Sequence, residues 1–189
     1  SLGWQGDDAP MIRAFLALPL PDEVLSALRV QQFLLPLPKR TDPDSFHLTL
    51  VFLGEQPEPV LEAAHERFVQ TRVPPFPLSL NSLGLFGGPK PRAAWAGVAP
   101  SEPLTRLQAK LDHAARSAGI VTESRRFHPH VTLGRFQPPG IEDIFRLERA
   151  IASGSTFTTP AWQVDHYVLY ESRQTKQGSV YSELARYDL

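Results

Sequence analysis

Two short stretches of this sequence carry the residues best suited to chemistry, and the two stretches are nearly identical. Histidine, an apolar residue, threonine and leucine follow one another at positions 47–50 and again at 130–133. The two histidines lie 83 positions apart, and so do the two threonines. Because alternate side chains of a strand face the same side, each histidine is expected to share a face with its threonine.

A fold that brings the two stretches together would assemble two imidazoles and two hydroxyls. An imidazole has an ordinary pKa of about 6.5, so His47 and His130 can divide the roles of proton donor and proton acceptor near pH 7. The neutral ring takes a proton from water, and the charged ring gives one to a leaving oxygen. The hydroxyls of Thr49 and Thr132 can hold phosphate oxygens. These four side chains can open a phosphodiester without a metal or a covalent intermediate.

The histidines admit two other interpretations. A single H-x-T triplet in a strand is common in purely structural settings, whereas two copies at matching places favour a function. His128 and His130 have a spacing that permits metal binding in a strand. However, Pro129 interrupts the strand, and no carboxylate or third histidine is close in sequence. No metal site is therefore predicted.

The elements that must position these residues also occur twice. A first apolar strand at 12–18 precedes two series of helix, strand, helix and hairpin. In the first series, a helix is expected from Pro21 to before Pro36, and a strand at 46–53 is ended by Gly54. A second helix follows Pro57 and Pro59, and strands at 78–83 and 93–98 form a hairpin. In the second series, a helix is expected from Pro103, a strand at 130–136, a helix from 141 to Gly154, and a hairpin of strands at 162–170 and 181–187. This order predicts an α+β fold of two lobes around a shared cleft, with mostly antiparallel sheets and outer helices.

Composition excludes several classes of protein. The chain has 189 residues, no cysteine, 19 prolines and a net charge of −1. It therefore has no disulfides, thiolate metal sites or cysteine nucleophile, and it lacks the basic charge of proteins that coat nucleic acid. No apolar run is long enough to span a membrane and no secretory signal is visible, so a soluble, cytoplasmic, monomeric protein is expected. Residues 11–189 are expected to form one bilobal domain, with 1–10 as an extension outside the fold.

Longer stretches around the two triplets resemble a known family. They are R-A-F-L-A-L-P at 13–19, F-H-L-T-L-V-F-L-G-E at 46–55, L-G-L-F at 83–86, A-W-A-G-V at 94–98 and F-H-P-H-V-T-L-G-R at 127–135. They resemble the RNA 2′,3′-cyclic phosphodiesterases, formerly called 2′-5′ RNA ligases, of the two-histidine phosphoesterase superfamily. The resemblance extends from about Met11 to the C-terminus. It implies a bilobal fold with one H-x-T motif per lobe and no cofactor. The implied substrate is an RNA 3′ end or nucleotide bearing a 2′,3′-cyclic phosphate, hydrolysed without metal to a 2′-phosphate.

The resemblance also implies roles for individual residues. His47 is expected to be the general acid, His130 the general base, and Thr49 and Thr132 ligands of the phosphate. Arg135 matches an arginine found after the second motif, and would offer a cation to the phosphate. Strict alternation places Arg135 opposite His130, so it reaches the cleft only if the strand ends or bulges near Gly134.

Several alternatives stay open at this point. The same two histidines would serve a 2′-5′ RNA ligase that joins RNA halves, or the cleft could belong to a non-catalytic module that binds RNA ends or nucleotides. The family often has an aromatic residue before its first motif, where this chain has residues 40–44, R-T-D-P-D. Phe15, Trp95 and Phe136 are candidate substitutes for stacking on a nucleobase.

Overall fold

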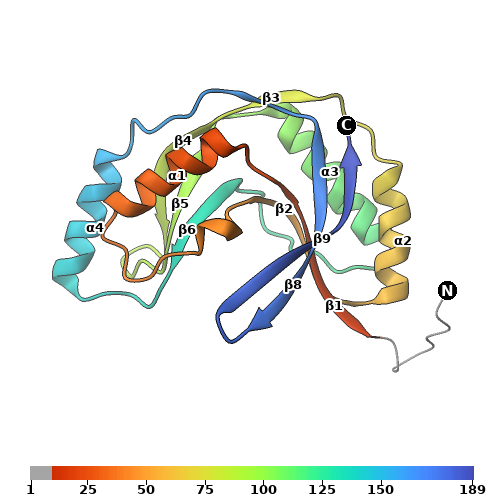
Figure 1. The fold of residues 1–189 in the computed structure, drawn as a ribbon, viewed down its shortest axis with the longest axis horizontal. Helices are drawn as coiled ribbons and strands as arrows, with labels where there is room; N and C mark the ends of the chain where they lie inside the picture. Colours follow the sequence, from red (N-terminus) through yellow and green to blue (C-terminus); the bar gives the residue numbers. More distant parts are fainter. Residues whose placement is uncertain (1–9) are drawn as a thin grey trace.

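The structure, a computed structural model, describes residues 10–189 and contains the duplicated order of elements (Figure 1). Strand β1 (Met11–Leu18) comes first. The first series is α1 (Asp22–Leu34), β2 (Leu48–Pro57), α2 (Glu58–Val69) and a hairpin of β4 (Leu80–Phe86) with β5 (Ala93–Val98). The second series is α3 (Glu102–Ser117), β6 (His130–Arg135), α4 (Ile141–Ser153) and a hairpin of β8 (His166–Thr175) with β9 (Gly178–Asp188). The predicted duplication is confirmed.

The two lobes do not correspond to the two halves of the chain. One sheet has the strand order β2-β1-β8-β9 and the other has β4-β5-β6, and all pairings are antiparallel. Each hairpin therefore joins the sheet that holds the histidine strand of the other half. The predicted α+β class and antiparallel sheets are confirmed, and each lobe is built from both halves of the sequence.

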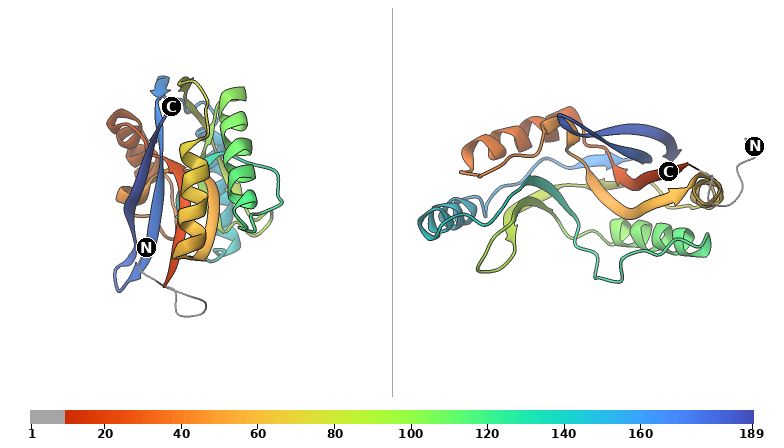
Figure 2. Two further views of the ribbon diagram at one scale, coloured as in Figure 1. Left: turned by 90° about the vertical axis from the view of Figure 1, so that its right-hand side faces the viewer. Right: turned by 90° about the horizontal axis from the view of Figure 1, so that it is seen from below.

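The helices cover the outer faces of the sheets, and α1 and α3 are exchanged between the halves. Helices α2 and α3 pack against each other and against β2, whereas α1 contacts β6 and α4 contacts β4. Figures 1 and 2 show α1 and α4 at one end of the molecule and α2 and α3 at the other. One continuous hydrophobic core runs through both lobes. Its burial excludes water from apolar side chains and fixes the two histidine strands relative to each other.

Two predicted strands were wrong in their extent, because the chain enters the large sheets later than expected. Leu78 belongs to a separate short strand, β3 (Phe76–Leu78), and Trp162 to its partner, β7 (Trp162–Val164). These two strands pair with each other rather than extending the hairpins, and so connect the two halves.

Strand β2 also differs from the prediction, because it does not end at Gly54. The chain continues through Gly54 to Pro57 and pairs with the beginning of β1. Gly54 has a φ of 71°, next to a bulge at Leu53. Glycine adopts this left-handed conformation without steric cost, so it permits the irregularity instead of ending the strand.

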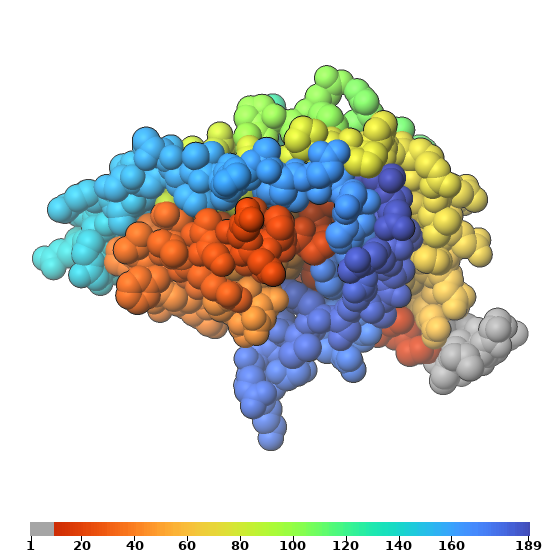
Figure 3. Space-filling view, turned by 45° about the horizontal axis from the view of Figure 1, so that its top comes forward, coloured from red at the N-terminus to blue at the C-terminus, as the bar shows by residue number. Residues whose placement is uncertain are grey.

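The end of the β8–β9 hairpin stands out from the body of the protein (Figure 3). Strand β1 pairs with β8 only between Val168 and Glu171, so the remainder of the hairpin extends beyond the sheet. No helix within residues 10–189 combines the length and apolar character needed to cross a membrane. The predicted extension at 1–10 falls, except for Pro10, outside the described residues.

Candidate active site

The first motif begins one residue before strand β2. A short 3₁₀ turn (Pro43–Ser45) leads into buried Phe46, and His47 follows. The Nδ1 atom of His47 lies 2.6 Å from the carbonyl oxygen of Ser45, and its Nε2 atom lies 3.0 Å from Oγ1 of Thr49. Because a carbonyl only accepts, Nδ1 must carry the proton in the neutral ring. Nε2 is then the atom available for proton transfer, and it shares a face with Thr49 as predicted.

The second motif repeats this anchoring. His130 is the first residue of β6, and its Nδ1 atom donates to the carbonyl oxygen of His128, two residues earlier, at 2.6 Å. Within residues 10–189, Nε2 of His130 has no hydrogen-bond partner. Leu48 and Leu50 in one strand, and Val131 and Leu133 in the other, are buried on the opposite faces, as alternation predicted. The anchoring through Nδ1 thus leaves Nε2, in both imidazoles, as the nitrogen that faces away from the backbone carbonyl.

A bulge follows each threonine, and the second bulge decides where Arg135 lies. Trp95 of β5 pairs with Thr132, but Ala94 pairs with Gly134 and Ala93 with Arg135, so Leu133 is the extra residue. Directly paired residues share a face. Arg135 therefore lies on the same face as Thr132 instead of the opposite one. The bulge near Gly134, which the sequence analysis required for Arg135 to reach the cleft, is present.

Two glutamines support these bulges, and sequence reasoning missed both. Nε2 of Gln32, a residue only 5% exposed on α1, donates to the carbonyl oxygens of Leu133 at 2.9 Å and Thr41 at 2.7 Å. The first-half bulge lies at Leu50, and Nε2 of Gln108 on α3 approaches the Leu50 carbonyl at 3.4 Å. Gln32 follows Val24 and Leu28 along the buried stripe of α1, and a polar residue in such a stripe was the available signal.

Aromatic rings surround His47. Phe15 stacks on its imidazole with ring centroids 4.8 Å apart, and Tyr181 meets the same imidazole edge-on at 5.2 Å. Phe15 is only 3% exposed, so it forms the back wall of the site rather than a free stacking surface. Beside His130 lie Phe86, at 5.0 Å, and partly exposed Trp95, at 6.4 Å. Tyr181 was not among the predicted site residues.

Burial and positive charge lower the pKa of both histidines. The pKa of His47 falls to about 4, chiefly because burial disfavours the charged ring; the charges of Arg135 and His130 add to this, and the Ser45 carbonyl opposes it. The pKa of His130 is also lowered, chiefly by burial, with further contributions from the charges of His128 and Arg135. Arg135 therefore acts electrostatically on both rings. An anion bound in the cleft would offset this charge and raise both pKa values.

The alternative of a metal pair at His128 and His130 gains no third ligand. Within the described part of the chain, no group of three His, Asp or Glu side chains is arranged to hold a metal ion. The rings of His128 and His130 lie 5.7 Å apart, and Nδ1 of His130 is already used by the His128 carbonyl.

Comparison with known proteins agrees with this geometry. Residues 20–176 match the family described as the 2′-5′ RNA ligase superfamily. The chain belongs to this superfamily. An RNA 2′,3′-cyclic phosphodiesterase of Aeropyrum pernix is 32% identical over 77% of this chain and 83% of its own length. Another from Thermus thermophilus is 30% identical over 94% of this chain and 90% of its own. The family resemblance read from the sequence is confirmed.

Solved structures of the superfamily share the fold. A crystal structure of Escherichia coli LigT complexed with 3′-AMP superposes with a TM-score of 0.77 at 27% identity, over 95% of this chain and 99% of that one. A crystal structure of TT0787 from Thermus thermophilus gives 0.73 at 29% identity, over 94% and 98%. The bilobal two-histidine fold is therefore shared along nearly the whole described chain.

Proposed function

We propose that this protein hydrolyses the 2′,3′-cyclic phosphate at an RNA 3′ end to a 2′-phosphate, with residues 11–189 acting as one catalytic unit. The observation that carries the proposal is the pair of histidines held identically, each through Nδ1 on the carbonyl two residues earlier. Membership of the superfamily and the cyclic phosphodiesterase activity for which a relative at 32% identity is named support it. An RNA-end substrate suits a protein whose net charge is only −1.

In the proposed mechanism, His130 takes a proton from water as the water oxygen attacks phosphorus. The P–O3′ bond breaks, and His47 gives its proton to O3′, which leaves a 2′-phosphate and a 3′-hydroxyl. Thr49, Thr132 and Arg135 hold the phosphate oxygens while the negative charge on them increases. No group outside the protein, the substrate and water takes part.

The lowered pKa of His47 makes its acid role depend on the substrate. Without substrate the His47 ring is neutral near pH 7, so it can give a proton to O3′ only in the complex, where the anion raises its pKa. The anionic substrate supplies the charge that favours the protonated ring, because it lies beside both histidines and Arg135. His130, which is less enclosed than His47, is the more suitable base.

The test is a turnover assay with an oligoribonucleotide ending in a 2′,3′-cyclic phosphate, in the presence of a chelator. The expected product is the 2′-phosphate, identified by resistance to a 3′-specific phosphatase or by phosphorus NMR. A 3′-phosphate would contradict the assigned bond, and activity lost to the chelator would contradict the metal-free chemistry. Binding without cleavage would favour a non-catalytic module.

Adding RNA with a 5′-hydroxyl tests the ligase alternative, whose product is a longer RNA. A monomeric, cytoplasmic protein stays a prediction.

A further inference from the structure

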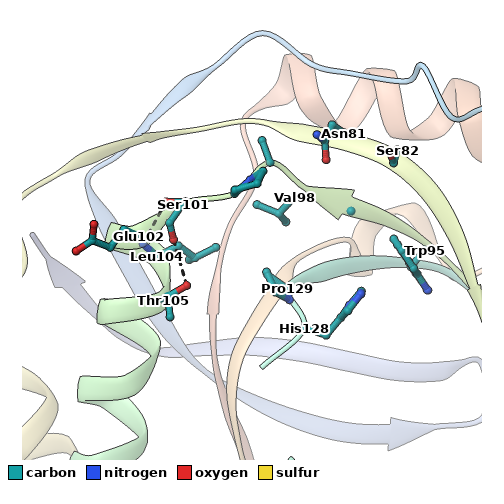
Figure 4. A pocket seen from close by; sticks show the side chains of 13 residues that line it. Asn81, Ser82, Trp95, Val98, Ser101, Glu102, Leu104, Thr105, His128 and Pro129 are labelled. Carbon is teal, nitrogen blue, oxygen red and sulfur yellow. Dashed lines mark hydrogen bonds between the residues drawn. The ribbon is translucent and has the colours of Figure 1, made fainter. Parts of the chain in front are cut away.

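A pocket of about 550 Å³ opens beside the second motif (Figure 4). His128 and Pro129, the residues immediately before His130, form one wall, and Trp95 of β5 forms another. The remaining walls come from β4, through Asn81, and from the beginning of α3, through Thr105. This volume lies within the range of roughly 300–1,000 Å³ that is typical of small-molecule sites.

The pocket shares the catalytic face of its sheet but contains none of the proposed catalytic residues. Gly97 pairs with His130 and Trp95 with Thr132, so these four residues face the same side. Gly97 and Trp95 line the pocket, whereas His130 and Thr132 do not. A molecule bound there would adjoin the reacting phosphate without touching the groups that transfer protons.

The indole of Trp95 lies across two glycines in a way that core packing does not require. A Cβ atom on Gly84 would overlap the indole ring, and one on Gly97 would meet it at 3.1 Å. The indole Nε1 is the one buried side-chain nitrogen or oxygen in the described residues that lacks a hydrogen-bond partner. An unpaired buried donor costs about 1–3 kcal/mol. Trp95 stays partly exposed despite this cost, and its indole forms a flat apolar floor of the pocket next to β6.

The walls around this floor suit a neutral heterocycle. They present the side chains of Asn81, Ser82 and Thr105, which donate and accept hydrogen bonds without charge. The one carboxylate at the rim, Glu102, is ion-paired with Arg106 at 2.6 Å. Exposed His128 lies between floor and catalytic site, with its ring centroid 4.8 Å from that of Trp95. An aromatic floor with neutral polar walls is the chemistry that binds a nucleobase.

The imidazole of His47 is instead surrounded by side chains of the protein itself. Phe15 covers one face of the His47 ring, and Tyr181 and Tyr170 pack around it. The substrate chain is therefore directed toward the lobe of His130.

We propose that this pocket binds the nucleotide on the 5′ side of the one that bears the cyclic phosphate, with its base on Trp95. The inference rests on the proposed function and extends it: the substrate is an RNA end of at least two nucleotides rather than a free cyclic mononucleotide. His128 then lies where it can donate to the phosphodiester that joins the two nucleotides.

The test compares two substrates, adenosine 2′,3′-cyclic phosphate and the dinucleotide ApA with a terminal 2′,3′-cyclic phosphate. The wild-type protein is expected to turn over the dinucleotide with kcat/KM at least about fivefold higher, the low end of what stacking one base contributes. Equal values for the two substrates would overturn the proposal. Failure to turn over either substrate would instead contradict the proposed function, so the two failures are distinguishable.

Two variants and a matched control locate the effect. Thr105→Phe fills the pocket from an exposed helix position, and Trp95→Leu removes the floor; both are expected to bring the dinucleotide down to the mononucleotide level. Ala109→Phe adds the same ring one turn further along α3, outside the pocket, and should keep the dinucleotide preference. If Thr105→Phe lowers turnover of both substrates equally while its thermal unfolding is unchanged, the pocket holds the terminal nucleotide and the proposal is wrong.

Discussion

His47 and His130 occupy equivalent positions in the two lobes, but the surfaces around them differ. His47 hydrogen-bonds Thr49 and lies under Phe15 and Tyr181, whereas His130 borders an open pocket. A duplicated motif therefore does not imply duplicated roles. The closed side makes its imidazole a stronger acid by burial, and the open side leaves its partner accessible to water and to the substrate chain.

The positions that follow the two motifs differ in the same way. Arg135 and Phe52 are separated by the same 83 residues as the two histidines, and each follows a bulge. The second lobe thus provides a guanidinium where the first provides an exposed ring, with Arg13 lying 4.7 Å over it. Of the two arginines, Arg135 lowers the pKa of both histidines and Arg13 does not contribute.

The largest effect should come from removing either imidazole. His47→Ala and His130→Ala are each expected to lower kcat by roughly 10²–10⁴-fold, because each eliminates one proton transfer. An aryl phosphodiester separates the two roles, since its phenolate leaves without a proton. With that substrate, His47→Ala should regain most of its activity and His130→Ala should not. The reverse pattern would exchange the assigned roles.

The next largest effect should be a loss of folding stability in acid that is caused by His47. The pKa of His47 is about 4 in the folded protein and ordinary, about 6.5, in the unfolded chain, so the unfolded state binds the proton first as the pH falls. Stability conferred by the neutral ring is therefore lost between pH 6.5 and 4, by about 2 kcal/mol between pH 7 and 5. His47→Gln should remove that part of the pH dependence in urea titrations at the two pH values. An unchanged difference between pH 7 and 5 would argue against the low pKa.

Arg135 tests the electrostatic difference between the lobes. Arg135→Gln should lower kcat/KM by roughly 10–100-fold, because a charge-assisted bond to the phosphate is lost. Removing the positive charge should also raise the pKa of both histidines. The alkaline limb of the profile of kcat/KM against pH should then move to higher pH. Arg13→Gln is the matched control and should leave the position of that limb unchanged; an equal movement would contradict the assignment to Arg135.

The smallest effects should come from the glutamines that hold the two bulges. Gln32→Leu removes the side-chain donor to the Thr41 carbonyl and one of the two donors to the Leu133 carbonyl, which keeps the Thr41 N–H. It should lower the free energy of unfolding by about 1–2 kcal/mol. Gln108→Leu removes one long contact of 3.4 Å and should cost less than about 1 kcal/mol. Denaturant titration measures both values. Equal losses would mean that the bulge after Thr132 is not specially supported.

Much of this arrangement could be predicted from the residues alone. The H-x-T strands, the helices after Pro21 and Pro103, and the repeated order of elements follow from local patterns, and each is present. The exchange of hairpins between lobes could not be predicted, because alternation identifies a strand without identifying its partner. The bulges at Leu50 and Leu133 were hidden for a similar reason. Each bulge depends on pairing with a strand that is distant in sequence. The flat position of Trp95 likewise depends on Gly84, its pairing partner in β4.

The pairing of β1 with β8 has a consequence for synthesis. Strand β1 (Met11–Leu18) lies between β2 and β8 (His166–Thr175), so this sheet is completed only when residues far apart in sequence meet. Such topologies fold slowly, because long loops must close before pairing is rewarded. On the ribosome, His47 remains without the wall formed by Tyr181 until the chain has emerged beyond residue 181. A nascent or truncated chain is therefore expected to carry both histidines and yet be unable to cleave RNA ends.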